Sequence, residues 1–411
     1  MAIRTPWQLF SRIVPVAIVG ILSLSLARRL GRSVGVESDV MTVTGGLPHN
    51  VTTEMNLELW ALAERLREAG FPKLLEESPA AELASLYLAG RLPELVQREL
   101  GGFLHLYGYR GVAEIDVGVA RWKDDPTHIF GVLANFMRLR DPQLVPDVQF
   151  RRAERAAGEA MQRALEDASR SGVMGLPSAV LLRFLFSRVR ALGGFRESPK
   201  AYAVAALGIC RRLLLSTGGE LTRKGRIVTA DDVFFLTLAE VKKALAGADQ
   251  RELVLARRAD YALELQRHRQ PRLLLSDGTG FYGDVPAAGA TDGRTLVGSP
   301  ASAGVYTGPA RVIFEPAGAR LEPGEVLVAP STDPGWTPLL MTAGGLVMEM
   351  GGMMSHGSIV AREYGIPAVV GVSGATSAIQ TGQVITVDGE TGMVLLTSES
   401  RAADTSAEGV S

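Results

Sequence analysis

The sequence predicts a multidomain protein in which an all-α domain is followed by a small mixed α/β domain. The chain has 411 residues, of which 46% are hydrophobic and 21% charged, so it is long and apolar enough for two or three domains with proper cores. From residue 41 to about residue 269, apolar residues recur at helical spacing between capping residues and glycines. After residue 297, short β-rich runs such as "VYTGPARVIF" and "EVLVAP" alternate with two short helical pieces.

Residues 1–40 are expected to form an apolar helical segment. Its apolar run, 13–27, lies between Arg12 and Arg28. The run is shorter than the ~20 residues that a membrane-spanning helix needs, and it contains a proline and a glycine. A helix buried in or docked on a soluble domain is therefore favoured. Membrane association through 13–27 is the alternative.

Residues 41–282 are expected to form a helical, bundle-like domain. Segments such as "TTEMNLELWALAERLREAG" open with capping threonines and an acidic first turn and close on a glycine. The stretch 283–297 is rich in Gly, Ala and Pro, which predicts a flexible linker. The α/β domain is expected at 298–397, and 398–411 is expected to be a disordered tail.

Charge and cysteine content exclude several classes of function. The 43 basic and 44 acidic residues give a net charge of −1, so the chain lacks the excess of positive charge that is typical of nucleic-acid-binding proteins. Cys210 is the only cysteine, which excludes a disulfide framework and a cysteine-based zinc site and fits a reduced, cytoplasmic setting. The four histidines other than His356 have no metal-ligand spacing, so no metal site is predicted.

The stretch "GGMMSHGSIVAREYGIP", Gly351 to Pro367, places a histidine at the start of a short helix. Ser355 is a good N-cap, and Gly365 sits where a left-handed C-terminal cap belongs, with a proline just beyond it. His356 is therefore expected on the first helical turn. A helix N-terminus offers free N–H groups to a phosphate and disfavours the imidazolium form.

A neutral imidazole beside such an anion cradle can attack a phosphoryl group and carry it covalently. The predicted phosphate-binding residues around His356 are Gly351, Gly352, Ser355 and Gly357. The alternative is a histidine that caps its own helix or packs in a core.

Two charged clusters lie in the helical region. In "FRESPKAYAV", Ser198 can cap a helix, which leaves Lys200 in its first turn and Arg196 just outside. This pair could hold a phosphoryl group in transit, or it could be two solvated cations. In "YGYRGVAEIDVGVARW", charges of both signs either line a substrate pocket or form an internal ion-pair network; they are Arg110, Glu114, Asp116 and Arg121.

The α/β region resembles the mobile phosphohistidine domain of phosphoenolpyruvate-utilising enzymes. The resemblance rests on "APSTDPGWTPLL", "GGLVMEMGGMMSHGSIVAREYGIPAVVGV" and "GQVITVDGETGMV", and it covers residues 297 to about 396. Gly357 stands where the family usually has a small residue such as alanine. The resemblance implies that His356 carries the phosphoryl group and that the domain swivels between a nucleotide site and an acceptor site.

The domain order resembles that of the rifampin phosphotransferases, where an ATP-grasp domain, a helical acceptor domain and the histidine domain follow one another. This implies that 41–282 is the acceptor domain and that Arg196 and Lys200 match an essential Arg and Lys. No glycine-rich phosphate loop with its lysine is found in the chain. ATP and Mg²⁺ are therefore expected on a separate ATP-grasp partner.

The predicted function is that of a phosphotransferase component that delivers a phosphoryl group to a hydroxyl of a small molecule. The sequence does not identify this acceptor. The alternatives are a non-catalytic phosphohistidine carrier, a regulatory ligand-binding protein, and an inactive remnant of a longer phosphoenolpyruvate synthase-like enzyme.

Overall fold

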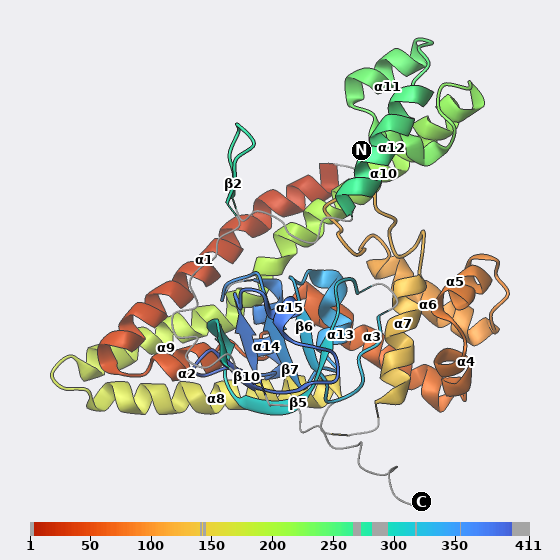
Figure 1. Cartoon of the computed structure of the whole chain (residues 1–411). Coiled ribbons are helices and arrows are strands. Elements are labelled where there is room, and N and C mark those ends of the chain that lie inside the picture. The colour runs from red at the N-terminus through yellow and green to blue at the C-terminus, as the bar shows by residue number, and fades with distance from the viewer. Residues whose placement is uncertain are drawn as a thin grey trace, which may run out of the picture.

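The computed structural model describes residues 4–139, 142, 145–265, 273–281, 295–316, 319–353 and 355–396. Figure 1 shows the α/β domain, coloured cyan to blue, beside the long helices α8 and α9 and next to helices α3 and α7. Helices α11 and α12 lie at the far end of α10, away from the sheet. The predicted all-α region followed by a mixed α/β region is confirmed.

The helices alternate with short turns along the first two thirds of the chain. Their bounds are α1 Arg4–Val34, α2 Glu37–Thr42, α3 Val51–Glu68, α4 Pro72–Glu77, α5 Ala80–Leu88, α6 Glu94–Tyr107, α7 Thr127–Arg138, α8 Pro146–Arg170, α9 Gly175–Leu192, η1 Gly193–Glu197, α10 Ser198–Arg223, η2 Ala230–Phe235, α11 Leu238–Leu245 and α12 Arg251–Leu265. In the α/β domain they are η3 Pro334–Trp336, α13 Thr337–Leu340, α14 His356–Tyr364 and α15 Ala375–Ala378.

Helix α1 is docked on the helical region along its length. It contacts α9, α10 and η1, and Gly20 lies so close to α9 that a Cβ there would sit 2.9 Å from the Leu192 carbonyl oxygen. Ala27 of α1 and Val40 of α2 share one buried cluster with Phe186 of α9. Helices α1 and α2 are therefore part of the same core as the helices that follow them.

The α/β domain is built on an eight-stranded mixed sheet with the order β3-β10-β9-β5-β6-β7-β8-β4. Strands β5 to β8 are parallel to one another, and the other pairs are antiparallel. The strands are β3 Thr295–Val297, β4 Ser299–Ser302, β5 Val305–Val312, β6 Val326–Ala329, β7 Gly345–Met348, β8 Ala368–Val370, β9 Val384–Asp388 and β10 Met393–Leu396. All residues of β6, β7 and β8 are buried, as expected for parallel strands covered on both faces.

Two boundaries differ from the sequence-based expectations. The sheet begins at Thr295, because β3 pairs with β10, so the last residues of the predicted linker 283–297 are strand. The rest of that linker and the predicted tail 398–411 lie outside the described residues. A small hairpin, β1 Leu273–Leu274 with β2 Gly280–Phe281, occurs within the range 41–282 that was expected to be helical.

The α/β domain packs on the helical region through α13 and α14. A single buried cluster joins Phe130 and Phe136 of α7 to Trp336, Leu340 and other residues of the α/β domain. Helix α13 contacts α7, and α14 contacts α8. This docking brings the N-terminus of α14 to the junction between the two regions.

Candidate active site

Helix α14 begins at His356 and ends before Gly365, which adopts the left-handed conformation with φ 67°. The predicted helix, its glycine cap and the first-turn position of His356 are confirmed. Ser355 occupies the N-cap position, but its hydroxyl makes no capping hydrogen bond. It lies 2.9 Å from the Ser358 hydroxyl, which itself donates to the Gly352 carbonyl oxygen. The predicted N-cap position of Ser355 is therefore confirmed, but the expected hydrogen bond from its side chain to the helix is not formed.

The imidazole of His356 spans the junction between the two regions. Its Nε2 lies 2.8 Å from the hydroxyl of Thr337 at the start of α13. Its Nδ1 has no hydrogen bond among the described residues and lies 3.9 Å from Oε2 of Glu197 in η1 of the helical region. The ring is therefore fixed by its own domain and presented to the other one.

Burial keeps this imidazole neutral at pH 7. Burial lowers the pKa of His356 well below its usual value, and the nearby cations Lys200, Arg110 and Arg196 lower it further. The expected neutral, nucleophilic ring is thus supported, and burial adds a cause that the sequence did not predict. The dominant causes are desolvation at the domain junction and cations supplied by the helical region.

An ion pair with a buried carboxylate holds Lys200, whose side chain is 36% exposed, at the junction near His356. Its ammonium lies 3.3 Å from Oε1 of Glu114, whose side chain is 1% exposed. The Nε of Arg110 donates to Oε2 of the same carboxylate at 2.6 Å. Of the two alternatives for Arg110 and Glu114, the structure shows the internal ion-pair network, and that network positions Lys200.

Arg196 sits at the end of η1 and contacts acidic residues from both regions. Its Nη2 is 3.7 Å from Oε1 of Glu363 on α14, and its Nε is 3.5 Å from Oε1 of Glu197. Helix α10 starts at Ser198 with Glu197 in the N-cap position, so the predicted Ser198 cap is wrong. Lys200 does lie in the first turn, and Arg196 just outside it. The solvated-cation alternative does not describe Arg196, whose side chain is 12% exposed.

Asp116 and Arg121, also predicted to bind substrate, do not join the His356 cluster. The Oδ1 of Asp116 accepts the backbone N–H of Gly118 at 2.7 Å within an exposed turn. Arg121 is fully buried, and among the described residues its guanidinium has no hydrogen-bond partner. Burial lowers the pKa of Arg121, and the carboxylate of Glu114 opposes that shift. The short Asp116 side chain satisfies its own loop and is not free to reach His356.

The structure adds a buried contact that the sequence did not predict. Glu363, on the same helix as His356, accepts a hydrogen bond from Nδ2 of Asn50 at 2.5 Å and another from the Thr53 hydroxyl. Asn50 also caps α3, because its Oδ1 accepts the N–H groups of Thr52 and Thr53. Burial raises the pKa of Glu363, and Arg196 opposes that shift. An asparagine before a helix is a readable cap signal, but its second partner lies far away in sequence.

A second contact between the regions involves Asp333, which was also missed. Its Oδ2 accepts the backbone N–H of Ala113 at 2.9 Å, and its Oδ1 accepts that of Gly335 at 2.8 Å. Ala113 has a φ of 52°, so this loop residue adopts the left-handed conformation where it meets Asp333. The loop that carries Arg110 and Glu114 is thereby fixed to the α/β domain.

The glycines near His356 serve different structural purposes. At Gly351, whose φ is 124°, a Cβ would lie 2.9 Å from the Ser355 hydroxyl. At Gly357 a Cβ would lie 2.4 Å from the Thr332 hydroxyl, so this position requires glycine for close packing. Gly352 is exposed and has open space around it. Phosphate binding by these residues and Ser355 stays a prediction.

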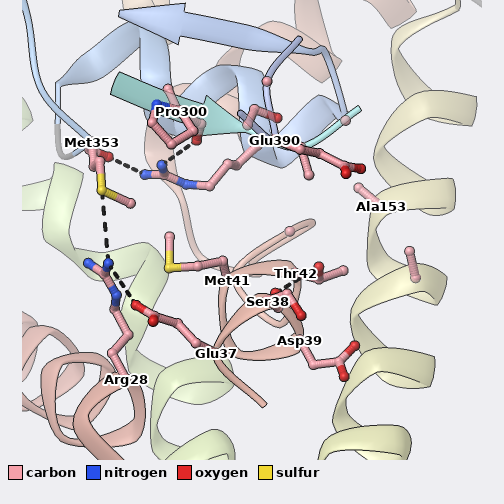
Figure 2. A pocket seen from close by; sticks show the side chains of 18 residues that line it. Arg28, Glu37, Ser38, Asp39, Met41, Thr42, Ala153, Pro300, Met353 and Glu390 are labelled. Atoms are coloured by element: carbon pink, nitrogen blue, oxygen red, sulfur yellow. Dashed lines mark hydrogen bonds and ion pairs between the residues drawn. The ribbon is translucent and has the colours of Figure 1, made fainter. Parts of the chain in front are cut away.

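A cavity of about 820 Å³ lies on the other side of α14, between the α/β domain and helices α1, α2 and α8. Figure 2 shows Arg28 and Glu37 on one wall and Met353 and Pro300 on the opposite one. A hydrogen bond between Arg28 and the Met353 sulfur, at 3.9 Å, crosses it. The two regions are thus tightly packed at His356 and loosely packed here.

Comparison with known proteins finds relatives of both regions. Residues 321–392 match the family described as PEP-utilising enzyme, mobile domain, and residues 12–197 match the rifampicin phosphotransferase fourth domain. The resemblance of the α/β region to the mobile domain of PEP-utilising enzymes is confirmed. His356 and its helix lie within the matched mobile domain.

Several curated relatives are similar along most of the chain. Rifampicin phosphotransferase of Bacillus subtilis is 31% identical over 90% of this chain, and that of a Streptomyces species is 35% identical over 90%. The prodigiosin synthesizing transferase PigC of Serratia marcescens is 28% identical over 94%. In each case the match covers 42–43% of the relative, so the chain spans less than half the length of these proteins.

Proposed function

We propose that this chain is the acceptor and carrier part of a phosphotransferase, in which His356 carries a phosphoryl group to a hydroxyl of a small molecule bound in the helical region. The observation that supports this most directly is the placement of a neutral imidazole of a mobile-type domain against Lys200, Arg110 and Arg196 of the helical region. The names of the relatives favour phosphotransfer.

In the proposed transfer, the bond between phosphorus and a ring nitrogen of His356 breaks as the acceptor oxygen forms its bond to phosphorus. The electron pair of the broken bond returns to the ring, which takes up the hydroxyl proton and is again neutral. Negative charge on the transferring group is neutralised by Lys200 and Arg196, since positioning and electrostatics dominate phosphoryl transfer. Glu114 acts as a positioning residue that holds Lys200 in place.

Loading of His356 requires that the ring leave its docked position, because it is largely buried at the junction. The cavity beside α14, where the two regions are loosely packed, favours such a movement. We assign ATP and Mg²⁺ to an ATP-grasp partner. Among the described residues, no three His, Cys, Asp or Glu side chains gather as metal ligands, so no step is routed through a metal on this chain.

The test is chemical phosphorylation of the purified chain with phosphoramidate, a small phosphoryl donor that needs no partner. We expect one phosphate per chain, labile to acid and stable to base, as a phosphorus–nitrogen bond is. His356→Ala should abolish the label, and His105→Ala, which alters an exposed histidine on α6, should retain it. An acid-stable label, no label, or full labelling of His356→Ala would show that His356 is not the nucleophile.

Transfer is tested by adding hydroxyl acceptors to the labelled chain, beginning with rifampicin because the relatives are named for it. Movement of phosphate from His356 to an added acceptor supports the enzyme. A label that is stable to every acceptor, yet passes back to other proteins, favours the non-catalytic carrier.

A further inference from the structure

Helix α1 exposes an apolar stripe that nothing in the described structure covers. Ile18, Leu22 and Leu26 are 48%, 56% and 52% exposed, and they lie one helical turn apart on the same face. Helix α9, which packs against α1, exposes a second stripe in the same way; its members are Leu176, Val180 and Phe184. Exposed stripes of large aliphatic and aromatic side chains on two helices that contact each other are the pattern of an interaction surface.

Arginines border this surface. Arg12 and Arg29 flank the stripe of α1, and Arg183 and Arg188 flank that of α9; all four are exposed. In the described part of the chain, none of them lies within ion-pair distance of an acidic side chain. A partner suited to this surface has an apolar centre and an acidic rim.

Crossing a lipid bilayer is a poor match for α1, although residues 8–34 are long and apolar enough to do so by length and composition. The opposite face of α1 is packed against protein, with Ala17 and Ala27 buried and Gly20 in contact with the backbone of α9. Insertion of α1 across a membrane would remove these contacts and would expose Ser23, which now lies in the protein interior, to hydrocarbon.

The family match indicates which polypeptide covers the surface. The match to a domain numbered fourth begins at residue 12, inside α1, so in that family other domains precede this helix. The relatives are more than twice as long as the matched part, since the match covers 43% of the Bacillus subtilis protein. In that family, α1 is thus the first helix of the matched region and the one nearest in sequence to the preceding domains.

We propose that the exposed stripes of α1 and α9 are the docking surface for the polypeptide that carries the earlier domains of this family, whether it is part of the same chain or a separate one. The proposal deepens the proposed function, because that polypeptide would also supply the phosphoryl group. The stripes lie on the exposed sides of α1 and α9, whereas His356 is largely buried at the junction, so docking on the stripes does not cover the imidazole.

The test is site-specific photocrosslinking of the full chain in the cells that produce it. A benzophenone side chain replaces Leu22 in one variant and Leu106 of α6 in the control; these leucines are 56% and 58% exposed. At position 22 we expect one dominant adduct, within or between chains, whose peptides align with the preceding part of the rifampicin phosphotransferases. The control position should give at most a tenth of that adduct.

Adducts with lipid, adducts with a second copy of this chain at α1, or no adduct at position 22 would each overturn the proposal. Leu22→Glu, an exposed substitution, should reduce the amount of associated polypeptide at least tenfold, whereas Leu106→Glu should not. Labelling of His356 by phosphoramidate needs no partner and should be equal in wild type and Leu22→Glu. If the crosslink fails but His356 is still labelled, only the proposed docking surface is refuted. If His356 is not labelled, only the proposed function is refuted.

Discussion

The contact between Asn50 and Glu363 gives the sharpest test of how the two regions are joined. Asn50 has two roles, since its oxygen caps α3 and its amide donates to the buried carboxylate of Glu363 at 2.5 Å. Asn50→Asp separates these roles. Aspartate caps a helix as well as asparagine does, so the cap is kept, while the amide donor is replaced by a second carboxylate.

The expected cost follows from the burial of both side chains, which are 2% and 1% exposed. Replacing the donor of a buried carboxylate by a second carboxylate costs ~3–5 kcal/mol, because a charge-assisted hydrogen bond is lost and two like charges are buried side by side. Asn50→Asp should therefore lower the free energy of unfolding by about that amount at pH 7. Lowering the pH should reduce the loss, since the paired carboxyl groups have a raised pKa when folded and protonation of one restores a donor.

A reversed pair supplies the control. In Asn50→Asp combined with Glu363→Gln, the donor and the acceptor exchange places, and most of the lost free energy should return. Urea unfolding of the wild type, both single variants and the double variant measures the coupling directly. The reasoning is refuted if Asn50→Asp is as stable as the wild type, or if the double variant is no more stable than the less stable single variant.

Three further predictions concern the site and its support. Lys200→Ala should slow transfer from His356 by roughly ten- to a hundredfold, because a charge-assisted contact worth ~1.5–3 kcal/mol is lost. Chemical labelling of His356 should persist in this variant. The control Lys224→Ala, at the far end of the same helix, should transfer phosphate at the parental rate. Gly357→Ala should cost ~1–3 kcal/mol in urea unfolding because its Cβ would press on Thr332, and Gly352→Ala, with open space around it, should cost less than about 0.5 kcal/mol. Burial lowers the pKa of His128 to about 4, so between about pH 6.5 and 4 the unfolded chain binds a proton at this residue and the folded chain does not. The free energy of unfolding should therefore fall by ~3 kcal/mol as the pH drops through that window. His128→Gln should flatten this pH dependence, and an unchanged pH profile of stability would contradict the prediction.

The sequence was sufficient for features that depend on neighbours along the chain. The position of His356 on the first turn of a helix follows from a glycine-containing entry and a left-handed Gly365, and both are local backbone preferences. The order of an all-α region and a mixed α/β region follows from hydrophobic periodicity, which is also local. The same reasoning did not predict the side-chain contacts of Ser355 and Ser198, because several nearby hydrogen-bond partners of similar strength compete for a serine hydroxyl.

The tertiary structure alone decided how the candidate site is assembled. Residues far apart in sequence meet there. The neutral state of His356 depends on burial against the helical region. The position of Lys200 depends on its ion pair with Glu114, and the buried carboxylate of Glu363 depends on the hydrogen bond from Asn50. Asp116, close in sequence to Glu114 and equally charged, is excluded because its side chain satisfies its own turn. The sequence determines which side chains are available and which local backbone carries them. Desolvation and the distance between charges, which set the pKa of a histidine and the strength of an ion pair, exist only after the domains have packed together.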